Sequence, residues 1–260
     1  MSAKYLQRAE FVKNTLSDIN DMMPILTLAD EKGVEILVTP AIPFGYGGRY
    51  VYNADDGHGM VGISPRISRR KQVSGGAHEL RHFWQDELIE CFRNDNILLN
   101  AEDTHVLNRI IEGDAHAFQE LIDPQIDAVL PLGLMGHLSR AFRHAAPPNA
   151  SREEILQNGF QAFQSGKTVK YYDQFTLNAF QEKMAAIVHN QLIQGNKAPP
   201  EFISLTEAFN RQGLTQIMGA GLGNGFAYLG AADVDTFVES VRRLIPKKMR
   251  QKCREAMATF

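Results

Sequence analysis

Two histidines and one glutamate stand at the spacing of a metal-binding helix within the first third of the chain. They are His78, Glu79 and His82, a complete His-Glu-x-x-His. Positions i and i+4 lie on one face of a helix, so the two imidazoles can bind the same ion. Glu79 follows the first histidine, which places its carboxylate beside the ion rather than on it. The pattern predicts a zinc site with one position open for water and Glu79 as the general base.

Apolar residues recur at helical spacing around this motif. They favour a packed helix over a solvent-facing helix that carries two histidines by chance. These residues are Ala77, Leu80, Phe83, Trp84, Leu88 and Ile89. The preceding Ser74-Gly75-Gly76 predicts a flexible break with a cap at the start of the helix.

A third protein ligand is required, because two histidines alone hold a catalytic zinc ion poorly. No histidine follows at the spacing of the metzincin extension, and Gln85 stands where that extension has a glycine. The third ligand is therefore expected to be an acidic residue on a later helix. The apolar periodicity predicts such a helix over residues 102–122.

Two acidic residues of this helix are candidates for the third ligand. Glu112 has the longer reach, whereas Asp114 has the helical phase of the inward apolar face marked by Ile110. They lie about 200° apart around the helix, so we expect one to bind the metal and the other to orient a histidine or to pair with Arg109. His116, one turn after Glu112, is a weaker third choice, because such a histidine is more often on the surface.

The two motifs together resemble a known group of enzymes. The segment His78-Glu79-Leu80-Arg81-His82, followed by Arg109-x-x-Glu112-Gly113-Asp114-Ala115, is similar to compact gluzincins, the ImmA/IrrE-like and related bacterial metallopeptidases. In particular it resembles a bacterial family with a His-Glu-Leu-Arg-His helix and an Arg-x-x-Glu-Ala-Asp-Ala helix, with Gly113 in place of alanine. The resemblance covers roughly residues 34–120. It implies a zinc-dependent peptidase in which the strand nearest the site is a template for an extended peptide or protein substrate.

One position departs from the pattern of many gluzincins, in which the ligand glutamate lies four residues before an aspartate. Ile110 stands at that position relative to Asp114. The choice between Glu112 and Asp114 therefore stays open.

The elements that must position the site are short. Residues 4–32 predict one or two amphipathic helices ended by Gly33, and residues 34–39 predict a strand. Residues 49–53 and 60–64 predict a hairpin, because the connection between them has turn chemistry throughout. The expected fold is α+β, a zincin-like core of backing helix, short antiparallel-containing sheet, active-site helix and ligand helix, with a mainly helical C-terminal half.

The second half predicts helices almost throughout. Residues 170–194 and 234–244 are amphipathic, and residues 151–154 and 204–207 match the capping box. We expect a catalytic core over residues 1–125 and a helical region over residues 126–260 that packs on it and is not an independent domain. The glycine-rich segment 218–225 lacks a preceding strand, so we interpret it as helix packing or a loop rather than a phosphate site.

Composition narrows the class of protein further. A net charge of -3 and a pI near 6.2 give no basic footprint for nucleic acid. Two cysteines are too few for a disulfide framework, and neither a secretory leader nor a membrane span is evident. We expect a cytoplasmic protein, and no pattern specifies an oligomeric state.

Several other residues have side chains that could act at the metal site, but the sequence does not show whether they lie near it. We expect His58 and His105 to be solvated loop or cap residues, and the basic run 66–71 to be a solvated loop. The residues eligible by type to stabilise an oxyanion are Tyr171, Tyr172 and His189.

The sequence therefore predicts a zinc metallopeptidase. One alternative is a zinc hydrolase that acts on a non-peptide amide. The other is a non-enzymatic helical interaction protein whose histidine pair is structural or belongs to a degenerate zincin site.

Overall fold

The computed structural model describes residues 2–53, 58–88, 98–130, 149–194, 202–212 and 233–259. These residues form an α+β structure, mostly helical with a small sheet, which confirms the expected class. The chain divides into two compact units, Met1–Glu87 with Ala115–Gly159, and Leu88–Asp114 with Phe160–Phe260. The chain changes unit three times, within α3 (Arg69–Leu88), α4 (Ala101–Val129) and α5 (Arg152–Ser165). The predicted boundary at residue 125 coincides with none of these changes, and a catalytic domain over residues 1–125 stays a prediction.

The first unit is built on a three-stranded mixed sheet. Its elements are α1 (Ala3–Ser17), η1 (Asn20–Met22), α2 (Met23–Glu31), β1 (Glu35–Val38), β2 (Gly48–Asn53) and β3 (His58–Ile63). The strand order is β1-β3-β2, with β1 parallel and β2 antiparallel to β3. The predicted helices, strand and hairpin are confirmed, and Gly33 follows α2 with the positive φ of 67° that favours glycine. The connection over residues 54–57 lies outside the described residues.

Helix α3 (Arg69–Leu88) carries the His-Glu-x-x-His motif and is longer than predicted. The expected break at Gly75 and Gly76 is wrong, because both glycines lie inside the helix. Gly76 serves close packing instead. A Cβ atom there would lie 3.0 Å from Cγ1 of Val12 in α1 and 3.2 Å from Cδ1 of Ile63 in β3.

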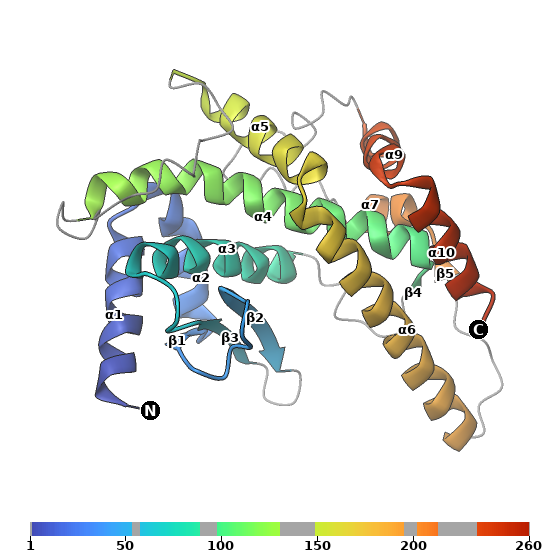
Figure 1. The fold of residues 1–260 in the computed structure, drawn as a ribbon, viewed down its shortest axis with the longest axis horizontal. Helices are drawn as coiled ribbons and strands as arrows, with labels where there is room; N and C mark the ends of the chain where they lie inside the picture. The colour runs from blue at the N-terminus through green and yellow to red at the C-terminus, as the bar shows by residue number, and fades with distance from the viewer. Residues whose placement is uncertain are drawn as a thin grey trace. The chain divides into compact units, whose positions relative to one another are not determined.

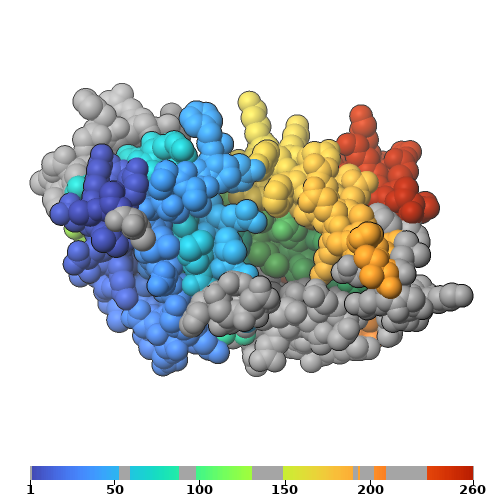
Figure 2. All heavy atoms as spheres, turned by 90° about the horizontal axis from the view of Figure 1, so that it is seen from below, coloured from blue at the N-terminus to red at the C-terminus, as the bar shows by residue number. Residues whose placement is uncertain are grey.

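Apolar burial holds α3 in the first unit. Ala77, Leu80 and Phe83 are buried as their spacing predicts, and Trp84 is half-buried. Full burial of a large apolar side chain contributes about 1.5–3 kcal/mol. Figure 1 shows α1, α2 and α3 gathered around the small sheet, and in Figure 2 the blue N-terminal elements form one continuous packed surface.

Helix α4 (Ala101–Val129) extends beyond the predicted range and continues past Pro124. Its apolar face is buried at Val106, Ile110, Phe118, Ile122 and Ile126. A second stripe is polar and recurs at alternating steps of four and three residues. Its members are His105, Arg109, Glu112, His116, Gln119 and Asp123.

Contacts from this polar stripe join α4 to α3 within the first unit. The side-chain amide of Gln119 donates a 2.6 Å hydrogen bond to the hydroxyl of Ser74. Arg70 donates to Asp127 at 2.6 and 3.0 Å and forms an ion pair with Asp123 at 3.4 Å. Burial raises the pKa of Asp123 above its usual range, although Ser74 and Arg70 oppose that shift.

The basic run over residues 66–71 is therefore only in part the solvated loop we expected. Arg70 is buried and paired. Arg66 donates a 2.8 Å hydrogen bond to the carbonyl of Ile42, and the guanidinium of Arg69 lies 5.0 Å from the centre of the Phe11 ring. These contacts hold the chain at the start of α3.

The described part of the second unit is helical apart from one short strand pair. Its elements, beyond its share of α4, are β4 (Leu98–Leu99), α6 (Thr168–Gln194), β5 (Phe202–Ile203), α7 (Leu205–Gln212), α9 (Val234–Leu244) and α10 (Lys247–Met257). Helix α5 (Arg152–Ser165) begins in the first unit and ends in the second. The predicted cap of α5 is confirmed, since Ser151 and Glu154 exchange hydrogen bonds of 2.7 and 3.2 Å. Segment 218–225 lies outside the described residues.

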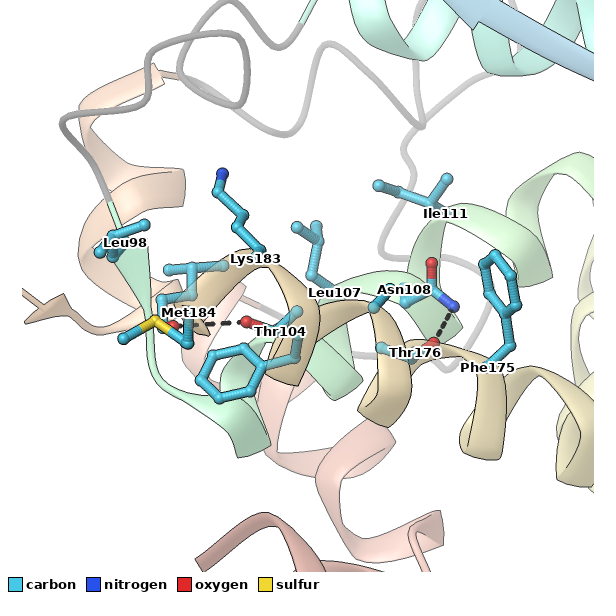
Figure 3. Close-up of a pocket in the computed structure, with 12 residues that line it drawn as sticks. Leu98, Thr104, Leu107, Asn108, Ile111, Phe175, Thr176, Lys183 and Met184 are labelled. Carbon is cyan, nitrogen blue, oxygen red and sulfur yellow. Dashed lines mark hydrogen bonds between the residues drawn. The ribbon is translucent and has the colours of Figure 1, made fainter. Parts of the chain in front are cut away.

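A cavity of about 250 Å³ lies within the second unit between α4 and α6. Most of its described lining is apolar, and Asn108 and Thr176, side by side in that lining, are joined by a hydrogen bond from the amide (Figure 3). None of the described residues that line it is a predicted site residue.

Candidate metal centre

His78 and His82 lie one turn apart on α3 and face each other. Their Nε2 atoms are 3.1 Å apart, and their ring centres are 4.8 Å apart with the rings nearly perpendicular. A zinc ion at the usual length of about 2.0–2.1 Å from both nitrogens would subtend an angle of about 100°, close to the tetrahedral value. The same separation is that of a hydrogen bond between the two rings, and it also places both nitrogens close enough to share one ion.

Gln85 sets the tautomer of His82. The Nδ1 atom of His82 lies 2.9 Å from the side-chain oxygen of Gln85, which is buried. An amide oxygen only accepts, so Nδ1 carries the hydrogen and Nε2 of the neutral ring keeps its lone pair for a metal. From the sequence, Gln85 is only a mismatch to the metzincin pattern, and this role of its side chain was not predicted.

The third potential donor comes from α4. A group of three potential ligands joins the two helices: His78, Glu112 and His116. Each offers one ligand atom, and these atoms lie within 4.8 Å of one another. It is the only such group of three among the described residues. Each of the three residues has a ring nitrogen or carboxylate oxygen closed to solvent, Nδ1 of His78, Oε2 of Glu112 and Nε2 of His116. Glu112 and His116 lie on one uninterrupted helix, one turn apart, as the two histidines do on α3. His82 is not a member of this group.

Helical phase separates the two acidic candidates. Asp114 is fully buried on the apolar face of α4, as its phase predicts, but it is not a member of the donor group. Glu112 lies on the polar stripe together with His116. The geometry thus brings Glu112, and not Asp114, to His78.

Glu79 lies against the edge strand of the sheet. Its Oε2 atom accepts a 2.8 Å hydrogen bond from the backbone N–H of Tyr50 in β2. The close approach requires Gly48, where a Cβ atom would lie 2.8 Å from Cγ and 3.1 Å from Oε1 of Glu79. The carboxylate is therefore fixed between α3 and β2, beside His78 in sequence.

Tyr50 also ties β2 to α3 through its side chain. Its hydroxyl donates a 3.1 Å hydrogen bond to Asp86, and its ring lies 6.0 Å from that of Phe83 in an edge-on arrangement. The strand edge that contacts Glu79 is thus held to the helix at more than one point.

His105 and Arg109 have a different role from the one we expected. His105 is 1% exposed, so its prediction as a solvated cap is wrong, and its Nε2 lies 2.8 Å from Oδ1 of Asp173. Arg109 donates to both oxygens of Asp173, at 2.8 and 2.7 Å, which makes Asp173 its partner in place of an acidic residue of α4.

Asp173 is the acidic centre of this buried network within the second unit. Burial alone would raise its pKa, but hydrogen bonds from His105 and Arg109 and the charge of Arg109 outweigh burial and hold the pKa of Asp173 below its usual range. The network joins α4 to α6.

The remaining sequence candidates are not placed with the donor group. Tyr171 and His189 are exposed on α6, and Tyr172 packs edge-on against Phe163 with ring centres 5.7 Å apart. The side chain of His58 lies outside the described residues. An oxyanion-stabilising residue is therefore not identified among them.

Comparison of the chain with protein-family models, with curated proteins and with solved structures finds no match. Among the described helices, none combines the length and the apolar composition needed to cross a bilayer. The chemistry of the site follows from its own geometry.

Proposed function

We propose that the protein is a zinc-dependent metallopeptidase in which His78, His82 and Glu112 hold the ion and Glu79 is the general base. The observation that carries this proposal is the 3.1 Å separation of the two Nε2 atoms, with a carboxylate from a second helix grouped with His78. Imidazole and carboxylate are the donors of catalytic zinc sites. The donor types present therefore fit this ion, with His78 as the residue that is close both to His82 and to Glu112.

The bound ion would supply a Lewis acid that makes a water more acidic and polarises the scissile carbonyl. Glu79 accepts the proton of the attacking water and delivers it to the leaving amine. The N–H of Tyr50 positions this carboxylate, and the absence of a side chain at Gly48 gives it room.

The outer edge of β2 supports an extended substrate. The N–H of Tyr50 points to Glu79 rather than to β3, so the backbone groups of residues 48 and 52 face the same edge, on which no strand of the described residues pairs. A peptide that pairs with this edge would pass Glu79. The sequence of backing helix, mixed sheet, α3 and α4 likewise supports a zincin-like core.

Hydrolysis of a peptide library by the purified, zinc-loaded protein tests this function. We expect Glu79→Gln to lower the rate by about 10²- to 10⁴-fold, the usual range for a general base, while zinc stays bound. His78→Ala should lose both zinc and hydrolysis. An unchanged rate in Glu79→Gln would reject the mechanism. Cleavage of non-peptide amides but not of peptides would show a zinc hydrolase of a different substrate class.

A further inference from the structure

We propose that the cavity between α4 and α6 binds a small, mostly apolar molecule that carries one N–H or O–H donor. All of its described lining residues belong to the second unit, and none of them is a predicted site residue. The proposed ligand site is therefore separate from the metal centre, and its test does not depend on zinc binding.

The cavity is too large to be a packing defect. Protein interiors contain few voids larger than a water molecule, and an engineered apolar cavity of about 150 Å³ binds benzene. The cavity between α4 and α6 measures about 250 Å³. In proportion to benzene, it has room for an occupant of about ten non-hydrogen atoms, the size of an indole or a small alkylphenol.

Apolar side chains form the inner wall and the mouth of this cavity. Leu107, Phe180 and Met184 are buried in the wall. Along α6 the lining residues Phe175, Ala179 and Lys183 recur at intervals of four residues and are all exposed, so the cavity opens to solvent on this side. Phe175 leaves 51% of its surface exposed, so a ligand in the mouth would remove apolar area from water.

Hydrogen bonds fix the direction of the polar group in the wall. The hydroxyl of Thr176 donates its only proton to the carbonyl of Tyr172 at 2.8 Å, so it can only accept from Asn108. The amide nitrogen of Asn108 therefore faces Thr176, and the amide oxygen is turned away from that hydroxyl (Figure 3). Among the described residues, no donor bonds to this oxygen, which leaves it as an acceptor in the lining of the cavity.

An acceptor in an apolar wall favours a ligand with a donor. Asn108 is half-buried, and a carbonyl that a ligand covers without a hydrogen bond costs free energy. An N–H or O–H on the ligand removes that cost. The ammonium of Lys183 points away from Asn108 and Thr176 (Figure 3), so the acceptor, rather than a charge, is the polar group that the ligand meets.

Calorimetric titration of the purified chain with indole and with indene tests the proposal. Indene has the same shape as indole but a CH₂ group in place of the N–H. We expect indole to bind about tenfold more tightly, the factor that one net hydrogen bond of about 1.4 kcal/mol gives. In Asn108→Leu, which removes the acceptor, the two molecules should bind with similar affinity.

A larger side chain at the mouth tests whether indole binds in this cavity. We expect loss of indole binding in Ala179→Leu, because the added atoms fill space that the ligand needs. Ala185→Leu is the matched control, since Ala185 is exposed on the same helix but is not among the described lining residues. This variant should bind indole as the wild type does.

Three results would overturn the proposal. They are no binding of indole by the wild type, equal affinity of the wild type for indole and indene, and unchanged binding of indole by Ala179→Leu. The comparison of indole with indene uses the wild type, so it decides the class of ligand even if a variant fails to fold. None of these results bears on the metal centre, whose zinc content is measured separately.

Discussion

The side chain of Glu79 lies in a narrow space between α3 and β2. Its carboxylate accepts the N–H of Tyr50, and its Cγ atom is close to Gly48. The position of the general base therefore depends on Gly48, a residue that has no side chain.

Replacement of Gly48 by alanine tests that dependence. A Cβ atom 2.8 Å from Cγ of Glu79 would push the flexible side chain away from Tyr50. Misplacement of a catalytic group by about 1 Å can lower the rate about 100-fold, so we expect a loss of that order with zinc content unchanged. Peptide hydrolysis and zinc analysis measure both quantities.

Gly75→Ala is the matched control for this variant, because a Cβ atom at Gly75 meets nothing within 4 Å. It should keep the wild-type rate. Wild-type hydrolysis by Gly48→Ala would contradict the positioning of Glu79 by β2.

At this scale the sequence predicted the donors of α3 and left those of α4 open. His78 and His82 follow from helical periodicity alone. The choice between Glu112 and Asp114 depends on which face of α4 turns to α3, which is a tertiary fact. His116 was predicted only as a weaker third choice, and Gln85 was missed as a site residue, because a lone histidine or glutamine has no diagnostic spacing.

Close helix packing accounts for Gly113, which stands where the motif that this helix resembles has an alanine. A Cβ atom at Gly113 would lie 2.6 and 2.8 Å from ring carbons of Phe160 and 2.9 Å from Nε2 of Gln164. Phe160 is fully buried, so its ring has little room to move. Gly113 lets α4 and α5 approach each other within the second unit.

Gly113→Ala should therefore destabilise the protein, although alanine favours a helix over glycine by about 1 kcal/mol. Overpacking of a core commonly costs about 1–3 kcal/mol, and we expect a net loss in the free energy of unfolding. Urea denaturation measures it. A more stable variant would show that the ring of Phe160 yields without strain.

The buried Asp173 joins α4 to α6 and makes stability depend on pH. Its pKa is lowered in the folded state, so the unfolded chain binds more protons in acid. The stabilisation is fully present above the ordinary carboxyl pKa of about 3.9 and is lost as pH falls through the lower, folded value.

We expect Asp173→Asn to lower the free energy of unfolding at pH 7 by about 3–5 kcal/mol, because the buried Arg109 loses its partner. The variant should also lose less stability than the wild type between pH 4.5 and 3, in relation to its own value at pH 7. Urea denaturation at these pH values checks both. Equal acid sensitivity in the two proteins would assign that dependence to other carboxyl groups.

At the scale of elements, the sequence predicted most helices and strands but not their lengths. The two glycines of α3 lie inside the helix because Gly76 packs against α1, and α4 continues through Pro124. Both outcomes depend on neighbours that are distant in sequence. Caps are local, and the capping box of α5 was predicted correctly.

At the scale of the molecule, each compact unit combines two segments of the chain, and α4 and α5 contribute to both. No shift in composition marks the points where the chain passes from one unit to the other, so the sequence favoured a single boundary near residue 125. Because α4 carries Glu112 and His116, the proposed metal centre depends on the placement of this long helix.

Zinc content per chain tests the central claim most directly. Elemental analysis of the protein purified from zinc-replete medium should find one zinc ion per wild-type chain. His82→Ala should bind it far more weakly, whereas His189→Ala on the exposed side of α6 should match the wild type. Absence of zinc from the wild type, or full zinc content in His82→Ala, would contradict a metal centre built on the two facing imidazoles of α3.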